Sequence, residues 1–483
     1  MNEYKLFVHR IGLMGLTNIL LALSSLIFLP VMTKSFSTAD YGIWVQINTT
    51  IALVVSASNL GLPYTMLRFL SAEKDKTVIQ ERFYSITAVL IFSASIISLI
   101  LLIFSSTISS YLFNNNSNIA LLLIPLTFFS CLNGLLINYF RTFQQMKKYS
   151  IFLILQTYLA VFIVSYLALN GFDIYIASTG LLISNLIIFI IISILIIKDI
   201  GLKIPKFSNI REYLSFGIPT VPANLSYWIL DSSDRYLIGI LMGTLFVGYY
   251  SPGYTLGYII VMIMAPFSLL LPSILPKYYE EKNEKQMHIY LDYSLKFFLL
   301  FAIPSVFGLS MLSKPLLLIL TTPEIALNGY LVTPFIALSF LLYGFHAIIS
   351  NVLVLEKKTK IFGLIWITAA LLNLGLNIFL IPYIGILGAA ISTLIAYFIA
   401  TLITLVYTTK SFKFNFNPKF ILKSTLASII MSLIIVIINP QGIIMIIFTT
   451  LICSAVYFLL LRISGGIKEE EIKLLKSIML NSN

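Results

Sequence analysis

Six polar residues follow one face of an apolar segment near the middle of the chain. They are Thr220, Asn224, Tyr227, Asp231, Asp234 and Arg235, at i, i+4, i+7, i+11, i+14 and i+15. Ionisable groups at the centre of a membrane span cost about 2.5–3.5 kcal/mol each or more, so they usually line a cavity or pair with one another. In a cavity, Asp231 or Asp234 would be the deep carboxylates able to hold a proton or a cation.

The same stripe has a structural alternative. An Asp231–Arg235 salt bridge at i,i+4 would merely lock the helix. Pro219 and Pro222, near one end of the segment, remove two backbone donors and predict a kink or break there, although membrane helices also tolerate proline. Both roles stay open. The candidate substrate-binding residues of this segment are Arg235, Asp234, Asp231, Asn224 and Tyr227.

Shorter polar stripes lie on other apolar segments. They contain Asn18 and Ser25, Asn48 and Asn59, Gly134, Asn138 and Arg141, His346 and Ser350, and Asn373 and Asn377. Such residues more often form hydrogen bonds between helices than bind ligands. Together they predict a wide, mildly polar interior, so we add Asn18, Asn48 and Asn59 to the substrate-binding candidates. His346 joins Asp231 and Asp234 as a candidate for ion coupling, because histidine titrates near neutrality. We expect no metal site and no cofactor other than a coupled H⁺ or Na⁺.

The composition predicts an integral membrane protein. Of 483 residues, 59% are hydrophobic and 10% are charged, against roughly 25% charged residues in soluble domains. With a mean hydropathy of +0.98, these values exclude an ordinary globular enzyme, a disordered chain and a disulfide-rich secreted scaffold. The two cysteines, Cys131 and Cys453, lie in apolar stretches and are expected to pack as small hydrophobic residues.

Fourteen apolar segments are long enough to cross a bilayer as helices, which takes about 20 residues. They are residues 11–33, 40–60, 83–104, 118–140, 150–170, 174–197, 212–239, 244–266, 292–313, 328–353, 361–381, 386–408, 420–438 and 442–462. The first is longer than the roughly 7–15-residue core of a cleavable signal peptide, so we expect it to be a retained span. The predicted fold class is an all-α polytopic membrane protein with about 14 transmembrane helices.

The positions of Lys and Arg predict the orientation. With a cytoplasmic N-terminus, 28 of the 31 Lys and Arg fall on the inner side, Lys34 and Lys314 fall on the outer side, and Arg235 lies within a span. This asymmetry predicts a multi-pass protein of the cytoplasmic membrane with both termini in the cytoplasm. Because the net charge of +12 is spread over eight inner segments that face anionic lipids, we expect no nucleic-acid partner.

Two short similarities indicate an internal repeat. Residues 36–42 resemble residues 242–248 at an offset of 206, and residues 134–148 resemble residues 344–358 at an offset of 210. Two tandem six-helix units would be related by an axis along the membrane normal, with the substrate site between them. The predicted divisions are pseudo-symmetric six-helix lobes at 1–200 and 201–410, followed by two further helices and an amphipathic cytoplasmic tail at 411–483.

A family likeness accompanies these patterns. Residues 216–236, followed by Val247–Tyr254, resemble the seventh-to-eighth-helix region of Wzx-type polysaccharide flippases, and Ser232-Ser-Asp-Arg-Tyr236 is the most specific part. Further similar segments are Tyr41–Trp44, Gly61–Arg68 and Pro382–Ala390, within a resemblance that covers residues 5–462. The resemblance implies the multidrug/oligosaccharidyl-lipid/polysaccharide exporter superfamily, with two six-helix lobes and alternating access. By motif match, Arg235, Asp234 and Arg68 become site candidates.

The resemblance implies a transporter and not an enzyme. Its members flip a polyprenyl-pyrophosphate-linked oligosaccharide from the inner to the outer leaflet for assembly of O-antigen, capsule or other glycans. A sugar head group cannot cross hydrocarbon unaided, because each unpaired hydroxyl costs about 2–7 kcal/mol to bury. The expected partners are this lipid-linked oligosaccharide, membrane lipids and polysaccharide assembly enzymes.

Three other functions compete with this prediction. The same fold could export small amphiphilic molecules coupled to a cation, which would require Asp231 or Asp234. A membrane glycosyltransferase or polymerase is disfavoured, because all the predicted outer loops are short. A non-transporting scaffold would leave the polar stripe on residues 220–235 unexplained.

Overall fold

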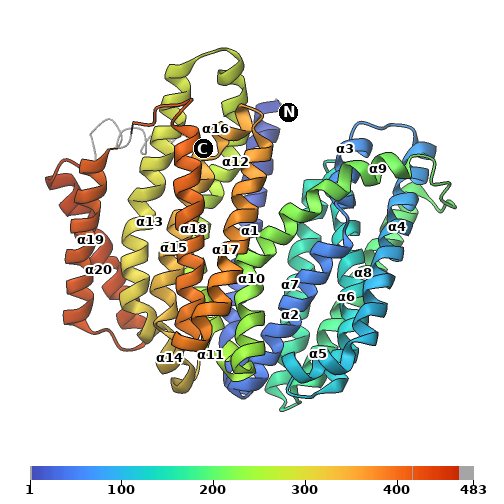
Figure 1. Ribbon diagram of the computed structural model, residues 1–483, viewed down its shortest axis with the longest axis horizontal. Helices are drawn as coiled ribbons and strands as arrows, with labels where there is room; N and C mark the ends of the chain where they lie inside the picture. Colours follow the sequence, from blue (N-terminus) through green and yellow to red (C-terminus); the bar gives the residue numbers. More distant parts are fainter. Residues whose placement is uncertain (1–2, 416, 467–483) are drawn as a thin grey trace. The chain divides into compact units, whose positions relative to one another are not determined.

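The computed structural model of the protein describes residues 3–415 and 417–466 (Figure 1). Within this part the regular structure is helical and no strand occurs, so the predicted all-α class is confirmed. The predicted amphipathic tail lies almost wholly outside the described residues.

The long helices account for the predicted spans. Twelve helices of the described part are long and apolar enough to cross a membrane, and the count rises to thirteen when α2 and α3, which meet at 49°, are taken as one bent span. The helix α10 carries three charged residues, Asp231, Asp234 and Arg235, and therefore falls outside that group. The twelve to thirteen candidates of the described part confirm the polytopic all-α fold class, and the predicted span at 212–239 corresponds to α10 and the end of the helix before it.

Two compact units make up the chain. Unit 1 contains residues 1–251 and 366–392, and unit 2 contains residues 252–365 and 393–483. The lobe boundaries that the repeat predicts, near residues 200 and 410, are a different division and stay a prediction. Each unit is described below by itself.

The helices of unit 1 are as follows. They are α1 (Glu3–Ser35), α2 (Thr38–Ser58), α3 (Leu62–Leu70), α4 (Lys76–Ile103), α5 (Ser105–Leu112), α6 (Ser117–Thr142), α7 (Met146–Leu169), α8 (Ile174–Ile200), α9 (Ile210–Gly217), the 3-10 helix η1 (Ile218–Thr220), α10 (Val221–Met242), the first half of α11 (Thr244–Tyr258), α17 (Thr359–Ile384) from Trp366 to its end, and the start of α18 (Ile386–Thr408) up to Ser392. The break between α9 and α10 falls where Pro219 and Pro222 predict it.

The centre of unit 1 is α6, which packs against α2, α4 and α8 (Figure 1). Its buried face is rich in Leu and Ile, and one polar cluster crosses it. The amide of Asn133 donates to the main-chain oxygen of Asn185 on α8 at 2.9 Å, and Gln156 on α7 donates to the side-chain oxygen of Asn185 at 3.3 Å. Because hydrogen bonds between amides fix helix register, α6, α7 and α8 are held to one another, and α6 and α8 pack against α2.

Glycine allows a backbone contact between α2 and α11. A Cβ atom on Gly42 would overlap the carbonyl oxygen of Thr244, and a Cβ atom on Gly248 would overlap the carbonyl oxygen of Thr38. Both pairs differ by the repeat offset of 206 residues, since Thr38 matches Thr244 and Gly42 matches Gly248. Such reciprocal contacts are expected where two equivalent stretches meet on a pseudo-two-fold axis.

A second backbone contact lies at the other end of α2. Gly61 has φ +70°, a conformation that suits glycine, and its Cβ would overlap the carbonyl oxygen of Gly217. A Cβ on Gly217 would in turn overlap the carbonyl oxygen of Leu60. The hydroxyl of Thr65 on α3 also donates to the carbonyl of Tyr213 on α9 at 3.2 Å. Both ends of α2 are thus held by close backbone contacts to the segment that runs from α9 to α11.

The helices of unit 2 are as follows. They are the second half of α11, α12 (Ile260–Glu280), α13 (Glu284–Leu320), α14 (Pro323–Gly329), α15 (Val332–Ile349), α16 (Asn351–Leu355), the start of α17, α18 from Thr393 on, α19 (Pro418–Ile438) and α20 (Gly442–Ile463). The sequence predicts that the eighth span ends at residue 266. In the structure α12 continues to Glu280 through Pro266, Pro272 and Pro276.

The centre of unit 2 is the 37-residue α13, which packs against α12, α15, α19 and α20 (Figure 1). The hydroxyl of Tyr457 on α20 donates to the carbonyl of Leu300 on α13 at 2.8 Å and lies 2.7 Å from the hydroxyl of Ser424 on α19. This shared hydrogen-bonded tyrosine fixes the last two helices against the centre of the unit.

Candidate substrate site on α10

The helix α10 has three faces, set by its 3.6-residue period. One face contacts α2, a second contacts α17 and α11, and a third lies between these two and is more open. The residues of the open face are Asn224, Tyr227, Asp231 and Arg235, at i, i+3, i+7 and i+11. All these contacts lie within unit 1.

Hydrogen bonds to α2 hold the first face. The side-chain amide of Gln46 donates to the carbonyl of Arg235 at 2.7 Å, and Gly239 leaves the space that this amide occupies. The hydroxyl of Tyr236 donates to the hydroxyl of Thr50 at 2.7 Å. These bonds fix the rotation of α10 about its axis, and therefore the direction in which its open face points.

The second face contains Asp234, one of the two acids of the polar stripe predicted from the sequence. Asp234 is 1% exposed, accepts the backbone N–H of Arg235 at 2.8 Å and also accepts the hydroxyl of Tyr250 on α11. On the same side, Ser233 lies 3.4 Å from the side-chain oxygen of Asn373 on α17, which accepts from Asn377 at 3.1 Å. Asp234 is therefore buried against α11, whereas Asp231 stays on the open face.

The guanidinium of Arg235 lies at the boundary between the faces. Its Nη1 atom donates to the carbonyl of Asp231 at 2.6 Å and lies 3.5 Å from the carboxylate of Asp234. The carboxylate of Asp231 accepts the hydroxyl of Ser232 at 3.0 Å. One acid thus balances part of the charge of Arg235, whose side chain is 13% exposed. A guanidinium carries five N–H donors in a planar fork, a geometry that matches carboxylate and phosphate oxygens.

We expect Tyr250→Phe to destabilise the protein by about 1–3 kcal/mol, because a buried carboxylate loses a hydrogen-bond donor. Thermal unfolding in detergent measures the effect. Tyr166→Phe is the matched control, since Tyr166 is 59% exposed. An equal loss of stability in both variants would contradict the structural role of the contact between Tyr250 and Asp234.

The remaining candidates of unit 1 lie on α1, α2 and α3. Asn18 is exposed on α1, and Asn48 is exposed on α2 with its amide donating to the carbonyl of Trp44 at 2.9 Å. Asn59 follows the last residue of α2, and its side-chain oxygen is buried without a partner among the described residues. Arg68 is exposed near the end of α3. None of the contacts described above joins these four residues to the cluster around Arg235.

The candidate His346 lies in unit 2. It is 1% exposed, and its Nδ1 atom lies 2.9 Å from the hydroxyl oxygen of Thr404 on α18. That hydroxyl donates to the carbonyl of Ala400 at 2.8 Å, so its oxygen accepts the N–H at Nδ1. This hydrogen bond joins α15 to α18, as expected of a structural histidine. A role of His346 in ion coupling stays a prediction.

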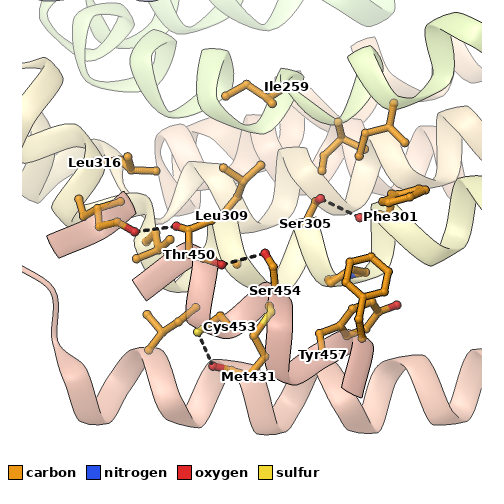
Figure 2. A pocket seen from close by; sticks show the side chains of 18 residues that line it. Ile259, Phe301, Ser305, Leu309, Leu316, Met431, Thr450, Cys453, Ser454 and Tyr457 are labelled. Carbon is orange, nitrogen blue, oxygen red and sulfur yellow. Dashed lines mark hydrogen bonds between the residues drawn. The ribbon is translucent and has the colours of Figure 1, made fainter. Parts of the chain in front are cut away.

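An apolar pocket also lies in unit 2, between α13 and the pair α19 and α20 (Figure 2). Its volume is about 320 Å³. Figure 2 shows Leu309 and Phe301 of α13 on one side and Thr450, Ser454 and Tyr457 of α20 on another. The few hydroxyls present are bonded to their own helices or to neighbours, as Thr450 and Ser454 are, so the surface is hydrocarbon in character.

Three neighbours of the candidate site were missed by sequence analysis. Gln46 carries no motif, and it lies 189 residues from its hydrogen-bond partner Arg235. Tyr250 falls within a segment that resembles the flippases, but nothing in the sequence pairs it with Asp234. Trp366 on α17, whose ring lies 6.5 Å from that of Tyr227, could have been found only by asking which aromatic residues share a face with Asn373 and Asn377.

The fold and this site define a polytopic helical membrane protein with a charged site inside a span. A family model described as "Polysaccharide biosynthesis protein" matches residues 18–324, which is more than half of the chain. The chain therefore belongs to this family, and the family resemblance predicted from the sequence is confirmed.

Two curated proteins are similar in sequence. The Haloferax volcanii protein described as probable low-salt glycan biosynthesis flippase Agl15 is 25% identical over 234 residues, 48% of this chain and 49% of that protein. The chain thus matches about half the length of this relative. The uncharacterized membrane protein MJ1068 of Methanocaldococcus jannaschii is 24% identical over 449 residues, 87% of each chain.

Solved structures share the fold. The lipid II flippase MurJ in an inward closed conformation has a TM-score of 0.74 at 20% identity, over 94% of this chain and 98% of that one. An inward-facing multidrug resistance MATE family transporter of the MOP superfamily has a TM-score of 0.68 at 14% identity, over 81% of this chain and 94% of that one. At these identities the likeness concerns the fold alone.

Proposed function

We propose that the protein flips a polyprenyl-pyrophosphate-linked oligosaccharide from the inner to the outer leaflet of the cytoplasmic membrane, for assembly of a surface polysaccharide or glycan. The observation that carries the proposal is the place of Arg235, a guanidinium within a span that lies on the more open face of α10, 3.5 Å from the carboxylate of Asp234. Arginine suits this role because its planar donors match phosphate oxygens in pairs. The descriptions of Agl15 as a probable glycan biosynthesis flippase and of MurJ as a lipid II flippase favour the same substrate class.

The two backbone contacts of α2 support alternating access. A transporter of this kind must open its cavity on one side at a time, so contacts at the two ends of a wall helix must separate in turn. With both termini in the cytoplasm, the contact around Gly42 and Gly248 would close the outer side, and the contact around Gly61 and Gly217 would close the inner side. Backbone contacts through glycine are compact and contain few long side chains, which suits surfaces that must part and meet again.

The lipid part of the substrate needs no polar cavity. Its chain would remain in the bilayer, and the apolar pocket beside α19 and α20 offers a surface on which hydrocarbon can lie. Enzymes that extend or polymerise the glycan are the partners we propose on either side of the membrane. No enzymatic step is assigned to this chain.

A cation-coupled exporter of small amphiphilic molecules is the second candidate. The specific observation in its favour is the fold shared with MATE family transporters, together with a carboxylate on the open face at Asp231. H⁺ or Na⁺ coupling through Asp231, Asp234 or His346 would also be compatible with a flippase. A substrate-dependent cation flux without any effect on lipid-linked oligosaccharide would favour the exporter.

Depletion of the protein from cells tests the proposal. We expect complete lipid-linked oligosaccharide to accumulate with its sugars protected from an enzyme that reaches only the outer leaflet. A matched strain that expresses the wild-type protein restores exposure of the sugars. Unchanged exposure in a strain without a second flippase would contradict the proposal, and short chains exposed outside would point to an enzyme.

A further inference from the structure

Two aromatic rings meet on the open face of α10. The rings of Tyr227 and of Trp366 on α17 lie 6.5 Å apart between centroids, at an interplanar angle of 65°. Tyr227 is 45% exposed and Trp366 is partly exposed, whereas the neighbouring Trp228 is buried against α2. Both rings belong to unit 1, so their arrangement is a property of that unit.

The position of Trp366 is set by buried hydrogen bonds farther along α17. Trp366, Asn373 and Asn377 stand at i, i+7 and i+11, which places them on one face of that helix. Asn373 and Asn377 are fully buried, and Asn373 contacts Ser233 of α10. This face of α17 therefore turns toward α10, and it opens to partial exposure at Trp366.

The other two tryptophans of the chain have structural surroundings. Trp44 is 8% exposed and packs edge-on against Phe28 at 5.5 Å. Trp228 is 9% exposed, and its indole N–H donates to the carbonyl of Thr49. Trp366 is the tryptophan that combines partial exposure with a place beside the candidate site.

Exposed aromatic rings beside polar groups suit a sugar. One face of a pyranose ring carries C–H groups, which pack on the negative face of an aromatic ring, while its hydroxyls need polar partners at the edge. Asn224 and Asp231 lie on the same face of α10, about one turn to either side of Tyr227. Arg235 lies eight residues from Tyr227, about 12 Å along the helix axis.

We propose that Tyr227 and Trp366 form a sugar-stacking subsite, which holds one pyranose ring of the head group while Arg235 binds the pyrophosphate. The inference rests on the proposed function and specifies how that site distinguishes a glycosylated lipid from a bare one. The two rings contact the apolar face of the sugar, and Asn224 and Asp231 form hydrogen bonds with its hydroxyls.

Binding to two kinds of lipid tests the subsite. The full-length protein in nanodiscs is titrated with polyprenyl pyrophosphate carrying one glucose, galactose or N-acetylglucosamine, and with sugar-free polyprenyl pyrophosphate. We expect Trp366→Leu and Tyr227→Leu to weaken binding of at least one glycosylated probe about tenfold and to leave the affinity for the sugar-free lipid unchanged. Trp366→Phe keeps a ring and should retain most of the affinity.

The controls separate this inference from the proposed function. Phe379→Leu removes another exposed aromatic ring of α17 and should change neither affinity. Equal weakening of all probes by Trp366→Leu and Tyr227→Leu, or no weakening of any, would overturn the subsite while the proposed function stands. A wild-type protein that binds neither kind of lipid would overturn the proposed function, and the subsite with it.

Discussion

Arg235→Ala should abolish transport of the lipid-linked oligosaccharide while the protein remains in the membrane at its normal abundance. In the structure the guanidinium of Arg235 donates to the carbonyl of Asp231 and lies 3.5 Å from the carboxylate of Asp234, on the face of α10 where we propose that the pyrophosphate binds. Hydrogen bonds to a charged group contribute about 1.5–3 kcal/mol each, and a pyrophosphate would lose at least two of them. The measurement is exposure of the sugars on the outer leaflet, normalised to the amount of protein.

Two further variants give this prediction its controls. Arg235→Lys keeps the charge but loses the paired donors, so it should transport weakly and bind less tightly than wild type. In the double variant Asp234→Asn with Arg235→Gln, both charges of the ion pair are removed together. Transport near the wild-type rate in the double variant would show that the two residues only stabilise the helix, as would a loss of abundance equal to the loss of transport in Arg235→Ala.

The number of spans and their approximate positions could be predicted, because hydrocarbon thickness sets the length of an apolar helix. The break before α10 could also be predicted, because Pro219 and Pro222 stand two and five residues after the last residue of α9. The same reasoning misplaces the end of α12. Its three prolines and Lys277 are typical of a loop, yet the helix continues through them, since neighbouring helices in a membrane protein satisfy the freed backbone groups.

The candidate site could be predicted only as a list of residues on one helix. Spacing along α10 places Asp231, Asp234 and Arg235 in one stripe, but the stripe is wide enough for Asp234 to turn toward Tyr250 of α11 while Asp231 stays open. Periodicity identifies the face of a helix and not the helix that it meets. For this reason Gln46 and Trp366, far from α10 in sequence, became part of the site only in the folded chain.

The internal repeat likewise predicts which stretches are equivalent and not which stretches are in contact. Sequence similarity relates residues 36–42 to residues 242–248, but it does not predict that the two stretches touch. In the structure they meet through two glycines: Gly42 lies against the carbonyl of Thr244, and Gly248 lies against the carbonyl of Thr38, the equivalent of Thr244. The two equivalent stretches are therefore also in contact with each other. A Cβ atom added at either glycine should have the same consequence.

Gly42→Ala should shift the transporter toward its outward-open state. The added Cβ would overlap the carbonyl oxygen of Thr244, and neither backbone can move aside without separating α2 from α11. Overpacking of this kind costs about 1–3 kcal/mol, which corresponds to a population shift of roughly 5- to 150-fold. A single cysteine at Thr244, which is 2% exposed, reports the change in a background without Cys131 and Cys453. Its labelling from outside by a membrane-impermeant maleimide should rise, and transport should fall.

The reciprocal contact supplies a stringent control for this prediction. Gly248→Ala should give the same labelling and the same loss of transport, and the double variant should add little, because one separated contact already opens the outer side. Gly375→Ala on α17 is the matched control, since a Cβ there meets open space. Unchanged labelling in Gly42→Ala at normal protein abundance would contradict a gate at this contact. So would additive effects of the two glycine changes, because they would mean that Gly42 and Gly248 act at separate places.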